Sequence, residues 1–379
     1  MKVTTTHFQV GNGDMTLITL ESGRRILVDC KITLRADDPN DDTADVGTQL
    51  RDLLERDGSD RLYVDAFLLT HPDQDHCAGL RRHFHLGLLS QWDPDDDKIV
   101  IREMWSSPIV FRRAERKTPL CEDALAWRKE ARRRVALFRA QGYAFDGDRI
   151  LILGEDIEGK TDDLGQILVT AGSTLARICG VTDASFRALL LAPLLASSED
   201  EALVLSKNNS SVIVRMSLSA GGNPDAARYL LGGDAEVAIW EKIWDRYQPE
   251  QLKYEVLLAP HHCSWHSLSE DSWSEKREEA KVSSKARDAL GQAAPGAHII
   301  LSSCEIKDDE FDPPCIRAKR EYLSILKPGC GAFRCVADEP DDRPLEMQVT
   351  YYGPKPTRWA IAAGGALGTG VGTEALGHG

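Results

Sequence analysis

The sequence predicts an α/β fold of four layers, an αββα sandwich with helical insertions. Two β-sheets pack face to face, and helices cover the outer face of each. Strand-like runs arrive in two groups with helical segments after each group, and sheets or helices with one apolar face must bury it against another layer. With 42% hydrophobic and 28% charged residues, the 379-residue chain suits one globular domain with insertions better than two domains.

The first group of elements occupies the amino-terminal part of the chain. Apolar runs bounded by glycine-containing turns predict strands, and apolar residues at helical spacing predict helices. The strands are expected at residues 3–10, 15–21, 25–29, 64–70 and 99–105. The helices are expected at residues 46–56 and 121–140, the second of which is basic.

The second group extends towards the carboxyl end. Strands are expected at residues 150–153, 166–170, 211–218, 228–231, 256–258 and 298–302. Helices are expected at residues 236–246, within 274–290, and at 316–326. Residues 1–355 form the predicted domain, with insertions at about 104–145 and 265–295, and the Gly- and Ala-rich residues 356–379 form a flexible tail.

Composition excludes several classes of protein. No apolar run approaches the roughly 20 residues of a bilayer helix, and residues 1–10 lack the pattern of a signal peptide, so we expect a cytoplasmic protein without membrane contact. Nine scattered cysteines without a CxxC motif predict reduced thiols rather than a disulfide framework. A net charge of −14 argues against a protein dedicated to coating nucleic acid.

One turn carries most of the predicted chemistry. His71, Asp73, Asp75 and His76 follow directly on the apolar strand at residues 64–70. Imidazole and carboxylate groups bind divalent cations, and alternate positions of an extended turn can converge on one ion. A polar turn that caps a helix is the structural alternative. The density of ligand-type residues favours a metal site.

The turn resembles the HxHxDH signature of the metallo-β-lactamase superfamily. It is similar to the HPDxDH form found in the metallo-β-lactamase-like domain of the DNA-uptake channel ComEC and its soluble relatives. The resemblance implies an αββα sandwich with a dinuclear metal site at one edge, and it implies nuclease chemistry. Asp73 stands where the second histidine is usual, and a carboxylate there favours Mn²⁺ or Mg²⁺ relative to Zn²⁺.

Three residues occupy supporting positions within the resemblance. Asp29 ends the third predicted strand, where the family places an acid that supports the ligand turn. Asn209 stands where other branches present a third-motif histidine. Asp312 lies where a later histidine of the group is missing.

The last two motifs end strands of the second group. A Gly-Gly-Asp sequence places Asp234 where the family has the carboxylate that bridges both metals, with a helix cap as the alternative. Its glycines would let the backbone approach the ions. A Pro-His-His turn follows the next strand, and its register with the family makes His262 a metal ligand and His261 a neighbour of the substrate.

The resemblance therefore implies three sets of site residues. The metal ligands are His71, Asp73, Asp75, His76, Asp234 and His262. The catalytic residues are Asp75 and His261. The residues that support these or contact substrate are Asp29, Asn209 and Asp312.

These residues predict a metal-dependent hydrolase, with a phosphodiesterase or nuclease as the preferred activity. Two divalent ions, Zn or Mn, would lower the pKa of a bridging water and supply hydroxide without a protein nucleophile. Hydrolysis of a small ester, lactone or amide at the same site is one alternative. A scaffold role in a multiprotein assembly is the other.

A basic segment suggests how a polyanionic substrate could approach. Residues 112–139 carry ten basic and four acidic side chains, a local charge of +6. This charge predicts guidance of nucleic acid or a nucleotide towards the metal pair, with Arg132, Arg133 and Arg134 as contributors. A solvated helix face is the alternative. The insertions and the tail offer surfaces for a protein partner.

Overall fold

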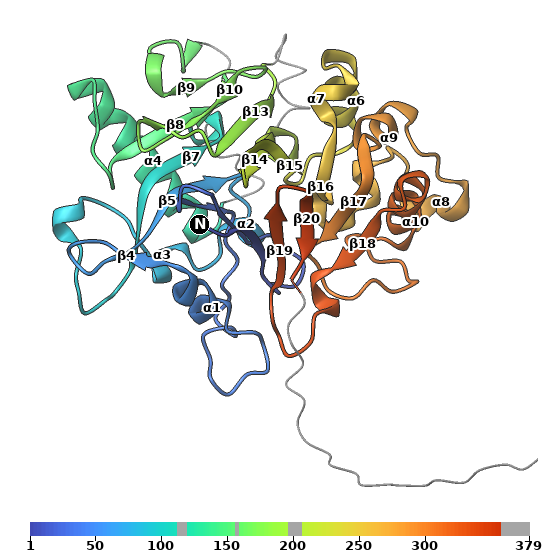
Figure 1. Cartoon of the computed structure of the whole chain (residues 1–379), viewed down its shortest axis with the longest axis horizontal. Coiled ribbons are helices and arrows are strands. Elements are labelled where there is room, and N and C mark those ends of the chain that lie inside the picture. Colours follow the sequence, from blue (N-terminus) through green and yellow to red (C-terminus); the bar gives the residue numbers. More distant parts are fainter. Residues whose placement is uncertain (112–119, 156–158, 196–206, 358–379) are drawn as a thin grey trace, which may run out of the picture.

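The computed structural model describes residues 1–111, 120–155, 159–195 and 207–357 (Figure 1). Two large sheets pack together and helices flank them on both sides, which confirms the predicted four-layer αββα arrangement. Residues 358–379 of the predicted tail and residues 112–119 of the basic segment lie outside the described part.

The first sheet has eleven strands within the described residues, in the order β20-β19-β1-β2-β3-β5-β7-β8-β9, with β4 paired to β5 and β6 to β7. The run from β3 through β5, β7 and β8 is parallel. The first strand pairs antiparallel with β19, near the end of the described chain. The strands are β1 (Val3–His7), β2 (Thr16–Thr19), β3 (Arg25–Val28), β4 (Glu55–Arg56), β5 (Leu62–Leu69), β6 (Phe84–His85), β7 (Ile99–Ser106), β8 (Arg149–Leu153), β9 (Leu168–Val169), β19 (Leu345–Thr350) and β20 (Gly353–Pro356).

The second sheet contains seven strands of the described chain, in the order β10-β13-β14-β15-β16-β17-β18. Strands β13, β14 and β15 form an antiparallel meander, and strands β15 to β18 run parallel to one another. These strands are β10 (Thr174–Leu175), β13 (Phe186–Ala192), β14 (Ile213–Ala220), β15 (Asn223–Leu231), β16 (Tyr254–Leu258), β17 (Ala293–Leu301) and β18 (Ala332–Cys335). A separate two-stranded ribbon pairs β11 (Arg177–Ile178) with β12 (Val181–Thr182).

Alternating burial in the second sheet explains why the layers form. Val214 of β14 packs into the core between the sheets, whereas its neighbour Ile213 belongs to a core shared with the outer helices. Val256 and Leu257 of β16 divide in the same way. Successive side chains of a strand point to opposite faces. An apolar strand in this sheet therefore stabilises two cores at once.

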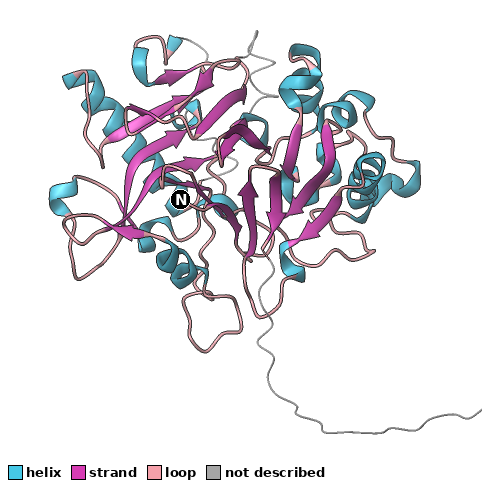
Figure 2. Cartoon of the chain, viewed as in Figure 1, coloured by secondary structure: helices cyan, strands magenta, loops and turns pink. Residues whose placement is uncertain are grey.

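Helices cover the outer face of each sheet (Figure 2). Those on the side of the first sheet are α1 (Val46–Leu53), α2 (Gln74–Cys77), α3 (Leu80–His83) and α4 (Glu122–Gln141). Those on the side of the second are α6 (Val237–Arg246), α7 (Pro249–Leu252), α8 (Trp273–Lys276), α9 (Ser284–Leu290) and α10 (Ile316–Leu326). The 3-10 helices are η1 (Leu89–Gln91), η2 (Pro108–Phe111), η4 (Gly165–Ile167), η5 (Lys207–Ser210), η6 (Pro260–Cys263), η7 (Trp265–Ser267), η8 (Arg277–Glu279), η9 (Lys327–Gly329) and η10 (Val336–Asp338). In the described part of the chain, none of the helices has the length and apolar character needed to span a bilayer.

Among the elements that differ from the prediction, three have a clear physical reason. The strand expected at 166–170 shrinks to β9, because Gly165 has a left-handed φ of 49° and a 3-10 turn follows it. The stretch at 274–290 divides into α8 and α9, since Arg277 also has a φ of 49°. The sequence does not predict β13, whose unbroken apolar run fits a helix as well as a strand.

Candidate metal centre

The predicted site residues come from the carboxyl ends of four strands. Asp29 follows β3 and His71 follows β5, and these strands are parallel neighbours in the first sheet. Asp234 follows β15 and His262 follows β16, which are parallel neighbours in the second sheet. Because parallel strands end at the same edge, each sheet brings its polar side chains to one place.

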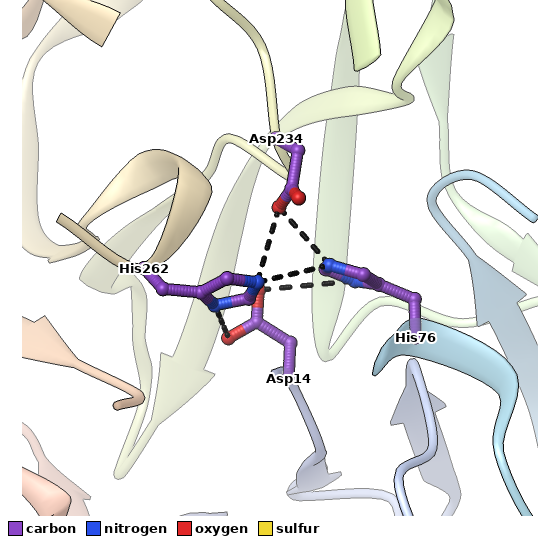
Figure 3. A group of neighbouring side chains, drawn as sticks. All are labelled: Asp14, His76, Asp234 and His262. Atoms are coloured by element: carbon purple, nitrogen blue, oxygen red, sulfur yellow. Dashed lines mark hydrogen bonds and ion pairs between the residues drawn. The ribbon is translucent and has the colours of Figure 1, made fainter. Parts of the chain in front are cut away.

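Four buried side chains form the centre of the site (Figure 3): Asp14, His76, Asp234 and His262. One ligand atom from each lies within 4.8 Å of the others. Nε2 of His76 is 3.0 Å from Oδ1 of Asp234 and 3.3 Å from Nε2 of His262. Two imidazoles and two carboxylates at such separations are a donor set suited to a divalent cation.

The remaining predicted ligands adjoin this centre. Oδ2 of Asp75 lies 3.2 Å from Nε2 of His262. Nε2 of His71 lies 3.5 Å from Oδ2 of Asp234 and 3.9 Å from Oδ2 of Asp73. The structure therefore brings all six predicted ligands together, although they come from segments more than 150 residues apart.

The two oxygens of Asp234 face different neighbours. Oδ1 lies 3.0 Å from Nε2 of His76 and 3.6 Å from Nε2 of His262. Oδ2 lies 3.5 Å from Nε2 of His71 and 3.8 Å from Nε2 of His261. A carboxylate with separate donors on each oxygen has the placement needed to contact two cations.

Several buried polar atoms of the site make no hydrogen bond with the described residues. They are Nε2 of His71, Oδ1 of Asp234 and Nδ1 of both His261 and His262. Buried polar atoms in proteins are almost always satisfied, and those that are not call for an ion or another partner. Nitrogen and carboxylate oxygen atoms that converge without hydrogen bonds fit a bound divalent metal.

The charges of the site depend on one another. Burial alone would raise the pKa of Asp234, but the imidazoles of His76, His71 and His262 outweigh burial and hold it well below its ordinary value. Burial lowers the pKa of His76, but the neighbouring carboxylates of Asp234 and Asp29 raise it well above 6.5. Metal binding requires neutral imidazoles and would displace these protons.

The carboxylate of Asp29 holds the ligand turn in place through hydrogen bonds. Its carboxylate accepts hydrogen bonds from the backbone nitrogen and from Oγ1 of Thr70, each at 2.7 Å. It also lies 2.9 Å from Nδ1 of His76. A carboxylate on Nδ1 sets the tautomer of an imidazole and leaves Nε2 free for a metal. Asp29 is thus placed to act through His76, the position that the resemblance implies for it.

The Pro-His-His turn is strained. His261, His262 and Cys263 have φ values of 49°, 50° and 66°, a conformation that residues other than glycine rarely adopt. The backbone nitrogen of His261 donates to the carbonyl of Gly233 at 2.9 Å, which ties the turn to the Asp234 strand end. In this strained conformation the side chain of His262 lies inside the cluster, whereas the side chain of His261 is 17% exposed.

The structure shows the contacts of one predicted supporting residue, Asp312, but does not describe the side chain of another, Asn209. Asp312 accepts hydrogen bonds from the backbone nitrogen of Trp265 at 3.1 and 3.2 Å, so it supports the segment that follows the Pro-His-His turn. Asn209 lies in η5, and its side chain is outside the described part of the structure. Its proposed place beside the metals stays a prediction.

The two glycines before Asp234 are in close contact with other parts of the protein. A Cβ on Gly232 would lie 2.9 Å from the ring of Trp240, and a Cβ on Gly233, whose φ is 48°, would lie 2.9 Å from Cβ of Ser211. Close contact with protein atoms is enough to require both glycines, and their role in approach of the backbone to ions stays a prediction.

Sequence patterns miss two residues of the site. Asp14 follows a Gly-Asn-Gly turn, and such a turn indicates a loop rather than a ligand. Lys31 lies beside this loop, and its ammonium donates to the carbonyl of Asn12. Burial lowers the pKa of Lys31, and Asp75 and Asp14 oppose this effect. The position of Asp14 just before a predicted strand is a signal that could have found it. The start of a strand lies at the same sheet edge as the end of its antiparallel neighbour, so a carboxylate there can reach ligands at that end.

Comparisons with known proteins were made at the level of sequence and of structure. No family model and no curated protein matches the chain. Among solved structures, the chain is similar to unliganded yeast PDE1, with 10% sequence identity and a TM-score of 0.39 over 88% of this chain and 98% of that one. A likeness this remote carries no argument about activity, and the resemblance to the DNA-uptake channel ComEC stays a prediction.

Proposed function

We propose that the protein is a metal-dependent hydrolase that cleaves phosphodiesters in nucleic acid or nucleotides, with two divalent ions, Zn or Mn, at the cluster around Asp234. The buried group of Asp14, His76, Asp234 and His262 is the observation that carries the proposal. In this group Oδ1 of Asp234 and Nδ1 of His262 are buried and make no hydrogen bond with the described residues, and a bound ion would satisfy such atoms.

Two groups of residues would hold the ions. His71 lies beside Oδ2 of Asp234, and Asp73 lies beside His71. His76, His262, Asp75 and Asp14 gather around Oδ1. Bound divalent ions make water a nucleophile near neutral pH and neutralise an anionic transition state.

The chain's own groups would orient the substrate and move a proton. Burial lowers the pKa of His261, so this imidazole is neutral at pH 7. Its partly exposed ring lies on the Oδ2 side of Asp234 and can contact a substrate from there. A neutral imidazole in this place can accept a proton from the attacking water through Nε2, and the imidazolium so formed can then donate that proton to the leaving oxygen.

Charge supports a phosphodiester over a neutral ester. Lys31 lies near enough to Asp75 and Asp14 for their charges to raise its pKa, and it has no ion pair with another described residue. A lysine ammonium beside a metal pair favours an anionic substrate. The HPDxDH resemblance points to the same substrate class.

The test combines elemental analysis with hydrolysis assays. Purified protein is analysed for bound metals and then assayed with bis(p-nitrophenyl) phosphate, with p-nitrophenyl acetate and with a lactone, each with and without Mn²⁺ or Zn²⁺. We expect metal-dependent cleavage of the phosphodiester. The Asp75→Asn variant should lose at least a hundredfold in rate and keep its fold, since the Asp75 side chain is 37% exposed.

A matched control separates the site from general damage. The Asp60→Asn variant changes an aspartate that is 87% exposed and should behave as the unmodified protein. Cleavage of only the acetate or the lactone would replace the proposal by the small-ester alternative. Protein that binds no metal and hydrolyses none of these compounds would favour the scaffold alternative.

A further inference from the structure

Two cysteines lie side by side behind the ligand turn. The sulfurs of Cys77 and Cys121 are 3.7 Å apart. Cys77 is buried at the end of α2 and directly follows His76, whereas Cys121 is half-buried and precedes α4. The two helices pack against each other. The pair therefore connects the metal turn to the longest helix on that side of the molecule.

Cys121 has the surroundings of a reactive thiol. It is the N-cap of the 20-residue α4, and its sulfur accepts a hydrogen bond from the backbone nitrogen of Ala124 at 3.4 Å. The positive end of a helix dipole stabilises a thiolate. The thiol of Cys77 and these backbone donors lower the pKa of Cys121 to about 6. Thiolates that solvent can reach are the form that peroxides oxidise.

Cys77 has the surroundings of a partner thiol. Its sulfur donates to the carbonyl of Asp73 at 3.0 Å, and no solvent reaches it. Asp123 of α4 accepts a hydrogen bond from the backbone nitrogen of Gly79 at 3.0 Å, on the other side of the pair. The contact between Asp123 and Gly79 joins the start of α4 to the segment that follows α2. A disulfide bond of about 2.05 Å requires the sulfurs to approach by only about 1.6 Å.

We propose that Cys77 and Cys121 form a reversible disulfide when hydrogen peroxide oxidises Cys121. The Cys121 thiolate attacks one peroxide oxygen, the O–O bond breaks, and hydroxide leaves and takes up the proton that Cys121 released. The Cys77 sulfur then attacks the sulfenic acid of Cys121, the S–O bond breaks, and water leaves with the Cys77 proton. Two thiols lose two electrons, and one peroxide becomes two waters.

The disulfide would act on the metal turn. A disulfide has no S–H group, so the carbonyl of Asp73 loses the donor that Cys77 supplies and keeps the backbone nitrogen of His76. Asp73 is the N-cap of α2, and Cys77 is the neighbour of His76. Loss of such an outer contact typically weakens a metal site about tenfold or more. This consequence rests on the proposed function, whereas formation of the disulfide does not.

The test maps the thiols of the full-length protein. Reduced protein is treated with one equivalent of hydrogen peroxide. It is then unfolded in the presence of an alkylating reagent that blocks free thiols, digested and analysed by mass spectrometry. The number of alkylated cysteines should fall from nine to seven, with a peptide that links Cys77 to Cys121 and disappears on reduction. Oxidation of other cysteines, while Cys77 and Cys121 remain alkylated, would overturn the proposal.

Three variants sharpen the result. Cys121→Ser should keep its fold, because serine is a preferred N-cap, and should retain Cys77 in alkylated form. Cys77→Ser should stop at a sulfenic acid on Cys121, which a cyclic 1,3-diketone traps. The control Cys330→Ser removes an exposed cysteine and should form the same disulfide as the unmodified protein.

A metal titration separates the disulfide from its consequence. Oxidised protein should bind Mn²⁺ about tenfold more weakly than reduced protein. Equal affinities of the two forms would overturn the link to the metal turn and leave the disulfide standing. Failure of both forms to bind metal would contradict the proposed function instead, because the mapped disulfide is measured without metal.

Discussion

Asp14 illustrates what a single side chain can add to a site that sequence motifs outline. Its carboxylate lies 3.8 Å from Nδ1 of His262 and 4.0 Å from Nδ1 of His76, inside the buried cluster. The predicted ligands come from three strand ends, whereas Asp14 comes from the turn before β2. It adds a negative charge to the cluster, and each such charge strengthens the binding of a divalent cation.

We expect the Asp14→Asn substitution to weaken metal binding by about ten to a hundred times, because an amide keeps the shape of the side chain and removes its charge. Isothermal titration with Mn²⁺ measures the change. Asp52→Asn, which alters an exposed carboxylate of α1, serves as the control. An unchanged affinity would place Asp14 outside the metal centre.

His7, the last residue of β1, makes the stability of the protein depend on pH. Burial lowers its pKa to about 3, and the neutral ring lies 3.0 Å from Oγ1 of Thr5 and 3.1 Å from Oγ1 of Thr16. The unfolded chain takes up a proton near pH 6.5, whereas the folded protein does so only near pH 3. Stability from this group is therefore present above pH 6.5 and declines as the pH falls towards 3.

The expected loss through His7 is on the order of 1 kcal/mol for each pH unit in that window. Urea denaturation at pH 7, 6, 5 and 4 measures it. The His7→Asn variant should be less stable at pH 7 but lose less on acidification than the unmodified protein. Variation of the more accessible His85 should leave the slope unchanged, and equal slopes for the His7 variant would disprove the assignment.

At the scale of the elements, α4 separates what sequence patterns can and cannot predict. The predicted span of 121–140 agrees with Glu122–Gln141 to within one residue. The use of its arginines differs from the prediction. The Arg134 side chain is only 1% exposed and pairs with Glu130 at 2.8 Å. It also donates to the backbone carbonyls of Ile101 and Arg149, so it joins the helix to the sheet.

Arg134 therefore cannot guide a polyanion as the sequence suggested, and for Arg133 this role stays a prediction. Arg133 is committed to Glu130 and Asp148, each at 2.7 Å. Arg134 continues the buried stripe of Trp127 and Ala131 at helical spacing, a signal that a charge count overlooks. Guidance by the exposed residues of the helix, such as Lys129, stays a prediction.

We expect the Arg134→Ala substitution to lower the free energy of unfolding by about 2 to 5 kcal/mol, because the two buried carbonyls lose this donor at about 1 to 3 kcal/mol each, and the Glu130 carboxylate keeps only Arg133 as an arginine partner. Urea denaturation measures the effect. Arg139→Ala changes an arginine of the same helix that is 41% exposed, and it should cost less than about 1 kcal/mol. Similar losses for the two variants would contradict the buried-clamp role.

The sequence predicts the strands that carry ligands better than the strands between them. A polar residue after an apolar run marks both the end of a strand and its function, which is why β5, β15 and β16 were predicted together with His71, Asp234 and His262. The pairing of β19 with β1 depends on contacts across the whole chain, and β13 lacks an alternating pattern. Asp14 lies just before β2, whose first residue pairs with the last residue of β3, and no sequence motif marks it as a ligand.

At the scale of the whole molecule, the candidate metal centre joins the two sheets. The ligand turn belongs to the first sheet, and Asp234 and His262 belong to the second. Their buried carboxylates and imidazoles are the polar contacts at the edge where both sheets end. A bound cation would therefore attach one half of the sandwich to the other.

Removal of metal should lower the thermal stability of the protein. A ligand that binds only the folded state stabilises it by about 2.7 kcal/mol when its free concentration is 100 times its Kd. We expect a chelator to lower Tm by several degrees, and excess Mn²⁺ or Zn²⁺ to restore it. Differential scanning calorimetry measures both changes. The Asp75→Asn variant should respond less, and an identical response would mean that the cations act elsewhere.

The pairing of β1 with β19 limits when the molecule can be completed during synthesis. Val3 pairs with Val349, 346 positions later. A ribosome that adds about 5 to 20 residues per second needs roughly 17 to 70 seconds to cover this distance. Until then, β1 can pair with β2 on one side only, and its other side is an open edge that can join a neighbouring nascent chain. Aggregation on crowded polysomes is therefore a greater hazard for this protein than for one whose sheets close in the order of translation.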